Sequence, residues 1–408
     1  MDSRFVIDTS DNRDYMYKNG ILLLDFGRRF PSPSGSSYYL GDNGLPLIER
    51  PRQTWITARM AHVYSIGKIL GIDGSMQLAD QAVNGLMGEL KDHRYGGFYS
   101  GITINGQTLP DKMCYAHAFV ILAATSALLA DIKSAKDLLY DALDVFDRYF
   151  WDEKEGLAYD NWDITFNRLD EYRGLNANMH TVEAFLAVAD ATSDEVYRKR
   201  AGRIIERVIA WAKEYNYRLP EHFDSDWKAV PDLNWDNPAD PFKPFGATPG
   251  HAMEWARLII QYAKSTSESG KQTDEYIKAA KDLYDRAYLD AWNADGEKGF
   301  VYTTDFEGNP VIHDRMHWTL AEAINTSSVL YRITGDKRYA DDFSTYLEYL
   351  DQSVMDHRYG SWFHQLDEKN SVIDTVWPGK PDIYHAFQAM LIPYVDPSVS
   401  ITSAILNR

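Results

Sequence analysis

Two kinds of helical segment alternate along this chain, and the alternation constrains its fold more than any other feature. Segments of the first kind are amphipathic, with apolar residues at helical spacing and a charged opposite face. They span 74–91, 135–150, 194–215, 274–292 and 337–354, with 11–30 as a weaker first member. Segments of the second kind carry little charge around most of their circumference, which is typical of helices covered by protein on all sides. They span 54–70, 113–132, 176–191, 251–264, 315–334 and 382–394.

A unit of one amphipathic and one apolar helix cannot bury its apolar face alone, so it must stack on copies of itself. Six such units predict an all-α fold, an (α/α)6 barrel, in which an inner ring of helices is enclosed by an outer ring. No Pro/Ser-rich linker or block of charge interrupts the pattern. We therefore expect residues 1–408 to form a single domain.

A loop with glycine and aromatic residues recurs between the units. Residues 92–99 (DHRYGGFY) are echoed by residues 356–363 (DHRYGSWF), and polar turns such as Asn105-Gly106 follow some of these loops. Such turns predict short β-hairpins at one face of the barrel. Because His93 and His357 belong to the repeated turn, we expect a structural role for them rather than a catalytic one.

Composition and charge exclude several classes of partner. With 42 basic and 60 acidic residues the formal net charge is −18, which repels nucleic acids and anionic membranes. One cysteine, Cys114, excludes an intrachain disulfide and fits a reducing compartment. The N-terminus has no export signal, and the most apolar window, 119–130, is too short to span a bilayer. We expect a cytoplasmic protein without nucleic-acid or membrane partners; a homo-oligomer is compatible with the sequence.

Polar residues gather at the starts of the six apolar segments. In an (α/α)6 barrel the inner helices run the same way, so these starts share one face. Buried polar groups are costly unless they meet each other or a ligand, which predicts a ligand site there. For any one residue, capping or core packing is an equal alternative. The residues are Arg59, Tyr115, His117, Asn176, Asn178, His180, His251, Glu254, His317, Trp318, Glu322, Asp382, Tyr384 and His385.

Two histidines of this set are suited to proton transfer. His251 follows the helix-breaking stretch 246–250, and His385 follows Pro381, so both lie in a first helical turn. Histidine is the side chain whose unperturbed pKa suits proton transfer near neutrality. Glu254, three residues after His251, is expected to orient or charge that imidazole.

Other chemistries lack a pattern in this sequence. His313 and His317 are four residues apart, but Arg315 lies between them and no third ligand is evident, so we predict no metal site. There is no phosphate-binding lysine loop, dinucleotide glycine pattern, serine elbow or Cys–His pair. We therefore expect no cofactor.

Four motifs, in order, resemble the inner-helix motifs of the N-acylglucosamine 2-epimerase superfamily. They are residues 54–60 (TWITARM), 176–184 (NANMHTVEA), 248–255 (TPGHAMEW) and 382–385 (DIYH). The resemblance extends over about residues 51 to 393 and is greatest to the aldose–ketose isomerase branch of the superfamily.

This resemblance implies a monosaccharide substrate and metal-free isomerisation through an enediol, with two essential histidines carried over onto His251 and His385. Which of the two handles the C2 proton stays open; we favour His385, with Arg59 stabilising the enediolate. Positions implied to line the sugar are Arg59, Tyr115, Asn176, His180 and Glu254, with Glu221 and Trp318 as weaker matches and Trp55 as a wall.

The resemblance also bears on the substrate. Sulfosugar-isomerising relatives carry an arginine in the loop before the TPGH motif and glutamines near the last two clusters. Here Lys243 is the one cation of that loop, and His364 and Pro381 occupy the later positions. These departures favour an uncharged hexose, with interconversion of D-mannose and D-fructose, or of a related aldose such as D-lyxose.

Besides a sulfoquinovose isomerase, whose anionic substrate Lys243 could still meet, three alternatives remain open at this stage. A sugar 2-epimerase of the mannose/glucose or N-acylglucosamine type would also use two histidines. A glycoside hydrolase on the same barrel would need paired carboxylates, for which the candidates are Asp163, Glu183, Glu221, Glu254 and Glu322. A sugar-binding protein without turnover is the third.

Overall fold

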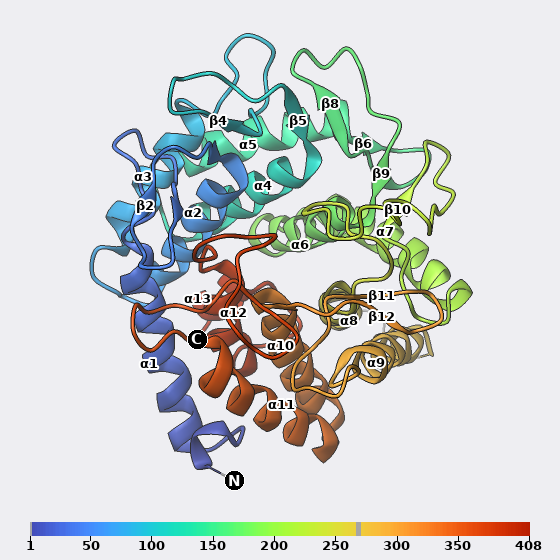
Figure 1. The fold of residues 1–408 in the computed structure, drawn as a ribbon. Helices are drawn as coiled ribbons and strands as arrows, with labels where there is room; N and C mark the ends of the chain where they lie inside the picture. The colour runs from blue at the N-terminus through green and yellow to red at the C-terminus, as the bar shows by residue number, and fades with distance from the viewer. Residues whose placement is uncertain (1, 267–270) are drawn as a thin grey trace.

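The apolar helices form a closed inner ring in the computed structural model, which describes residues 2–266 and 271–408 (Figure 1). Each helix of the ring contacts the next, and the last contacts the first. Their surfaces lack a polar face because protein surrounds them on every side. The inner helices are α2 (Thr54–Ile69), α4 (Cys114–Leu129), α6 (Leu175–Thr192), α8 (Pro249–Ser265), α10 (His317–Thr334) and α12 (Tyr384–Leu391).

An outer ring of amphipathic helices surrounds the inner one. Each outer helix packs on the inner helix that precedes it, and α1 packs on α12 and so completes the last pair. The predicted (α/α)6 barrel is confirmed for the described residues, the weaker segment 11–30 included. The outer helices are α1 (Ser10–Gly27), α3 (Ser75–Met87), α5 (Ala135–Val145), α7 (Glu195–Glu214), α9 (Lys271–Ala291) and α11 (Lys337–Tyr349).

Local sequence sets where several of these helices begin and end. The Asp194 carboxylate caps α7 by accepting a hydrogen bond from the backbone N–H of Val196 at 3.0 Å. Asp336 caps α11 in the same way, two residues before the N–H that donates to it. Gly335, at φ 71°, ends α10 in the left-handed conformation that glycine adopts without strain. Two adjacent residues, Gly335 and Asp336, thus end the inner helix α10 and begin the outer helix α11.

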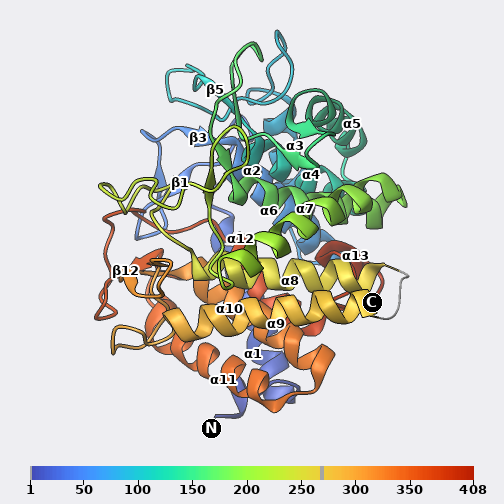
Figure 2. The ribbon, with the colours of Figure 1, turned by 90° about the vertical axis from the view of Figure 1, so that its right-hand side faces the viewer.

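Short antiparallel strand pairs close each unit at one end of the barrel, where Figure 2 shows the loops gathered. The strand before an inner helix pairs with the strand after its outer helix, and single bridges, Ala247 with Thr304 and Leu40 with Lys380, do the same for α8 and α12. These pairs are β3 (Arg52–Gln53) with β4 (Gly101–Ile102), β5 (Asp111–Met113) with β8 (Asn161–Asp163), β9 (Arg173–Gly174) with β10 (His222–Phe223), and β13 (Arg315–Met316) with β14 (Gln365–Leu366).

Local hairpins lie at the same end, as predicted. They are β1 (Tyr39–Leu40) with β2 (Pro46–Leu47), β6 (Trp151–Asp152) with β7 (Leu157–Ala158), and β11 (Thr303–Thr304) with β12 (Pro310–Ile312). The pairing between strands on either side of a helix pair was not predicted, because strands of two or three residues carry no periodic pattern.

The repeated glycine–aromatic turn is structural. The Asp92 carboxylate accepts two backbone hydrogen bonds from its own turn, at 2.8 and 3.0 Å, and pairs with buried Lys112 at 2.7 Å. Asp356 makes the same contacts in the second copy, with its own buried lysine at 2.5 Å. His93 and His357 are exposed in these turns, and a structural role for them stays a prediction.

The far end of the ring is closed by a short C-terminal helix that the sequence did not predict. Helix α13 (Ile401–Leu406) contacts α2, α4 and α6, at the end opposite the strands (Figure 2). Thr402 Oγ1 lies 2.9 Å from Ser126 Oγ of α4, and the Ser400 N–H donates to Asp190 at 2.6 Å. Among the described residues, no helix combines the length and apolarity that crossing a membrane requires.

Candidate active site

A pocket of about 850 Å³, open solvent at its mouth included, lies at the end of the ring where the inner helices begin. Nine of the ten residues predicted to form the site line this pocket, and the tenth, Glu221, lies behind one of them. The nine are Trp55, Arg59, Tyr115, Asn176, His180, His251, Glu254, Trp318 and His385.

His251 stands in the first turn of α8, two residues after Pro249, which begins the helix at a position that proline favours. Its Nδ1 lies 3.0 Å from Glu221 Oε1, and its ring packs on Trp318 with centroids 4.8 Å apart. A carboxylate only accepts hydrogen bonds, so the neutral imidazole carries its proton on Nδ1. Nε2, which has no hydrogen-bond partner in the described part of the chain, is left with its lone pair for a ligand.

His385 repeats this arrangement from α12. Its Nδ1 lies 3.0 Å from Oε1 of Glu322, a fully buried side chain of α10, and its ring lies 6.0 Å from that of Trp318. Burial, and then the charge of Arg59, hold the pKa of His385 well below its usual value. The imidazole is therefore neutral near pH 7, as a general base must be before it accepts a proton.

Glu254 differs from expectation, because it does not hydrogen-bond to His251. Its Oε1 lies 3.5 Å from Arg257 Nη2 and 4.0 Å from His180 Nδ1, while Oε2 is buried without a hydrogen-bond partner among the described residues. Burial, followed by the charge of Glu322, raises the pKa of Glu254 well above its usual value. Because Glu254 follows His251 by three residues along α8, its side chain lies about one helical turn deeper in the ring than the imidazole that it was expected to support.

Arg59 is held among aromatic rings at the wall of the pocket. Its Nη1 lies 3.0 Å from Asp382 Oδ2, and its Nη2 donates to the Tyr115 hydroxyl at 2.7 Å. The guanidinium also lies over Phe119 and Trp55, 4.3 and 4.9 Å from the ring centroids. Burial opposes the charge, but the neighbouring tyrosine and aspartate leave the pKa of Arg59 raised, so it is a fixed cation.

His180 and Asn176 complete the wall from α6. His180 Nδ1 lies 3.2 Å from Glu183 Oε2, and its ring packs on Phe119 at 4.4 Å. Burial lowers the pKa of His180 to about 4, so this imidazole is neutral near pH 7. Asn176 Oδ1 is buried with no partner in the described ranges, and such an atom requires a water or a ligand hydroxyl.

Two residues of the predicted set and one of the hydrolase candidates serve neighbouring loops instead. His117 accepts the Phe98 N–H at 3.0 Å, and Asn178 bonds to the backbone of Ala158 at 2.8 and 3.0 Å. Asp163, considered for hydrolysis, accepts backbone hydrogen bonds within its own turn. None of the three lines the pocket.

Several pocket residues were not predicted, because they come from loops that carry no helical pattern. Phe242 and Trp377 both line the pocket and meet edge to face, with their ring centroids 5.3 Å apart. The signal available was aromatic residues in proline-rich loops, as in residues 377–381 (WPGKP). The other lining residues of this kind are Phe30, Tyr39, Pro241, Pro244, Tyr302 and Lys380.

The cations near the pocket are already compensated. Arg59 pairs with Asp382 at 3.0 Å and Lys380 with Asp356 at 2.5 Å. Lys243 lies over the Tyr172 ring, 3.8 Å from its centroid, and does not line the pocket. No unpaired cation therefore faces a ligand from the described lining residues.

The histidine pair considered for metal binding is separated. Residues 315–316 form a strand rather than a helix, so His313 turns away to Asp295 at 3.1 Å while His317 lines the pocket. In the part of the chain that the structure describes, two other groups are close enough to hold an ion: His180 with Glu183 and Glu254, and Glu254 with Glu322 and His385. The guanidinium of Arg257 already contacts Glu254 and Glu322, at 3.5 and 3.2 Å.

Comparison with known proteins agrees with this geometry. The profile of the N-acylglucosamine 2-epimerase (GlcNAc 2-epimerase) family matches residues 35–389, so the chain belongs to this family. The D-mannose isomerase of Pseudomonas cannabina pv. alisalensis is 40% identical over 397 residues, 97% of this chain and 95% of the relative. That of Thermobifida fusca is 39% identical over 387 residues, 94% of each chain. A crystal structure of a D-mannose isomerase superposes with a TM-score of 0.86 at 26% identity, covering 93% of this chain and 97% of that one.

Proposed function

We propose that this protein is an aldose–ketose isomerase that interconverts D-mannose and D-fructose. One observation in the structure carries the chemistry: two imidazoles, each with Nδ1 fixed by a buried glutamate, contact the same tryptophan and offer Nε2 to one pocket. Near-full-length identity of 40% and 39% to proteins named D-mannose isomerase supports the substrate.

In the proposed mechanism, His251 moves protons on the sugar oxygens during ring opening, with the charge it acquires balanced by Glu221. His385 Nε2 then takes the C2 proton, the C2–H electron pair forms the C1–C2 double bond, and the C1 carbonyl oxygen becomes an enediolate. His251 then carries the O2 proton to O1, which moves the negative charge to O2. Collapse of O2 to a carbonyl returns the same proton from His385 to C1 and gives the ketose. The single base acts on one face of a planar intermediate.

The remaining residues would hold and stabilise the sugar. Arg59, a cation fixed next to Tyr115, is suited to the enediolate oxygen, and one well-placed donor of this kind contributes about 3 to 4 kcal/mol. Asn176 and His180 would bind hydroxyls, and Trp55 and Trp318 would pack on the carbon skeleton. An uncharged sugar fits best, because the cations of the lining are paired.

Hydrolysis is disfavoured by the carboxylates present. Among the described lining residues only Glu254 and Asp382 carry one, and Asp382 is committed to Arg59. A glycosidase needs both an acid and a base or nucleophile at the scissile bond.

We also propose that the chain works as a single domain in a reducing, cytoplasmic compartment, where its one cysteine, buried Cys114, stays reduced.

The test is incubation of the purified protein with D-mannose in chelator-treated buffer, followed by NMR of the sugars. Accumulation of fructose supports the proposal. Glucose without fructose would identify an epimerase instead, release of reducing sugar from oligosaccharides a hydrolase, and sugar binding without turnover a binding protein.

A further inference from the structure

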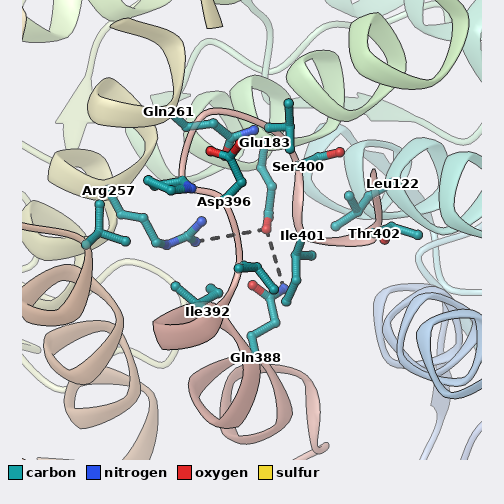
Figure 3. A pocket seen from close by; sticks show the side chains of 14 residues that line it. Leu122, Glu183, Arg257, Gln261, Gln388, Ile392, Asp396, Ser400, Ile401 and Thr402 are labelled. Carbon is teal, nitrogen blue, oxygen red and sulfur yellow. Dashed lines mark hydrogen bonds and ion pairs between the residues drawn. The ribbon is translucent and has the colours of Figure 1, made fainter. Parts of the chain in front are cut away.

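A single buried arginine stands among three glutamates from three helices of the ring. Arg257 Nε donates to Glu322 at 3.2 Å, its Nη2 lies 3.5 Å from Glu254, and Nη2 is 4.0 Å from Glu183. Figure 3 shows Arg257 and Gln388 both directed at the same oxygen of Glu183. The guanidinium is therefore a counter-ion shared by the carboxylates, with no second cation in contact with them among the described residues.

The contacts continue from these glutamates to the imidazoles of the pocket. Glu322 holds His385 Nδ1 at 3.0 Å, and Glu183 holds His180 Nδ1 at 3.2 Å. Arg257 itself does not line the substrate pocket. It faces a second cavity, on the far side of the cluster, which it lines together with Glu183, Gln261 and Gln388 (Figure 3). Any effect of Arg257 on a sugar must therefore pass through another side chain.

The position of Glu322 depends on this arginine. Its Oε1 faces His385 while its Oε2 accepts the Arg257 Nε–H, so both oxygens are used and the carboxylate cannot rotate without losing a charged hydrogen bond. A buried carboxylate without a cation tends to take up a proton. A protonated or rotated Glu322 would no longer hold the proton of His385 on Nδ1.

We propose that Arg257 is a positioning residue for the isomerisation: its contact with Oε2 holds the Glu322 carboxylate with Oε1 aimed at Nδ1 of His385, which leaves Nε2 free to accept the C2 proton. The inference rests on the proposed function for the step it serves. The structural part of the inference, that Arg257 controls the imidazole of His385, does not depend on the proposed function.

Removal of Arg257 takes one positive charge from a closed cluster. The cluster then binds protons more readily, whether on a carboxylate or on the imidazole, so protonation of His385 is expected at higher pH. The groups that face His385 are Arg59 of α2, His180 and Glu183 of α6, Glu254 and Arg257 of α8, His317 and Glu322 of α10, and its neighbour Tyr384 on α12.

The experiment compares Arg257→Met, which has no charge, with Arg257→Lys, which keeps it. For Arg257→Met we expect kcat to fall at least about tenfold and the acid limb of the kcat/KM profile to move up by about one pH unit. Arg257→Lys should keep the limb in place and give a folded protein if the methionine variant does not fold. Arg198→Met is the matched control: it removes a partly buried arginine that pairs with Asp190 at 3.1 Å, away from the pocket, and should leave both parameters unchanged.

A double-mutant cycle tests the route through Glu322. If Arg257 acts through this carboxylate, Arg257→Met should change kcat by less than about twofold in a Glu322→Gln background. Equal effects of Arg257→Met in both backgrounds, or a fall in kcat/KM by the same factor at every pH, would overturn the proposal.

One readout does not need turnover. The pKa of His385, followed by NMR of its ring nitrogens, should rise in Arg257→Met whether or not mannose is a substrate. An unchanged His385 titration refutes the positioning role, whereas a wild-type protein that titrates as described but converts no mannose refutes only the proposed function.

Discussion

The hydrogen bond between Glu221 and His251 gives the most direct test of the acid–base assignment. Glu221 is 4% exposed, and its Oε1 lies 3.0 Å from Nδ1 of the imidazole. Glu221→Gln keeps the size of the side chain and removes its charge. When His251 takes a proton from the sugar, the imidazolium would then form next to a neutral amide. The amide NH2 can also donate to Nδ1 and place the ring proton on Nε2 instead.

The size of the effect follows from the strength of this bond. A hydrogen bond to a charged group contributes about 1.5 to 3 kcal/mol, and each 1.36 kcal/mol is a factor of ten in rate. We therefore expect Glu221→Gln to lower kcat for D-mannose by roughly 10- to 150-fold. KM should change little, because the charge is needed only when the imidazole is protonated. The assay is fructose formation at saturating mannose across the accessible pH range.

A matched control separates this effect from a general loss of a buried carboxylate. Glu89 is also partly buried, accepts from Arg52 at 3.0 Å and lies outside the pocket, so Glu89→Gln should retain activity. A Glu221→Gln enzyme that folds normally and keeps kcat within about twofold of the wild type would refute the assignment of His251 as an acid–base group.

Four further outcomes are expected. His251→Ala and His385→Ala should each lower kcat at least about 100-fold in the mannose assay. Dialysis against a chelator should leave kcat unchanged, and loss of activity restored by one metal would contradict metal-free chemistry. Asp382→Asn breaks the buried pair with Arg59 and should lower the free energy of unfolding in denaturant by about 3 to 5 kcal/mol. Burial lowers the pKa of His62 to about 4, so below pH 6.5 the unfolded state binds more protons than the folded state. Stability should therefore fall as the pH drops from 6.5 towards 4, by up to about 3 kcal/mol from this residue, and His62→Asn should show a shallower fall in urea titrations.

The fold could be predicted from the sequence because the burial of a helix determines how many charged residues it carries and on which side. An inner helix such as α4 is covered on every side and loses its polar face, whereas an outer helix such as α7 keeps charges on one side. Helix α13 and the two-residue strands were not predicted, because they are too short to show such a pattern. Segments this short have no periodicity, and their pairing partners lie many residues away.

The site was accessible only in part. The shared direction of the inner helices brought nine predicted residues to one pocket, because helix starts can be located from local sequence. The partners of the histidines could not be located in this way. Spacing along α8 favoured Glu254 for His251, but the carboxylate in contact is Glu221, 30 residues away in the chain and on a loop after α7. Only the closed ring determines such a contact.

The two histidine–glutamate pairs share a feature that explains why the ring must close for chemistry to occur. His251 on α8 is held by a carboxylate from the preceding helix pair, and His385 on α12 by one from α10, again the preceding pair. Each imidazole therefore lies on one unit while the group that fixes its proton lies on its neighbour. A small shift between adjacent units would break a 3.0 Å contact and misplace a proton without unfolding any helix. We infer that close packing between units, as of Trp318 on His251, is as necessary to the proton transfers as the titrating groups themselves.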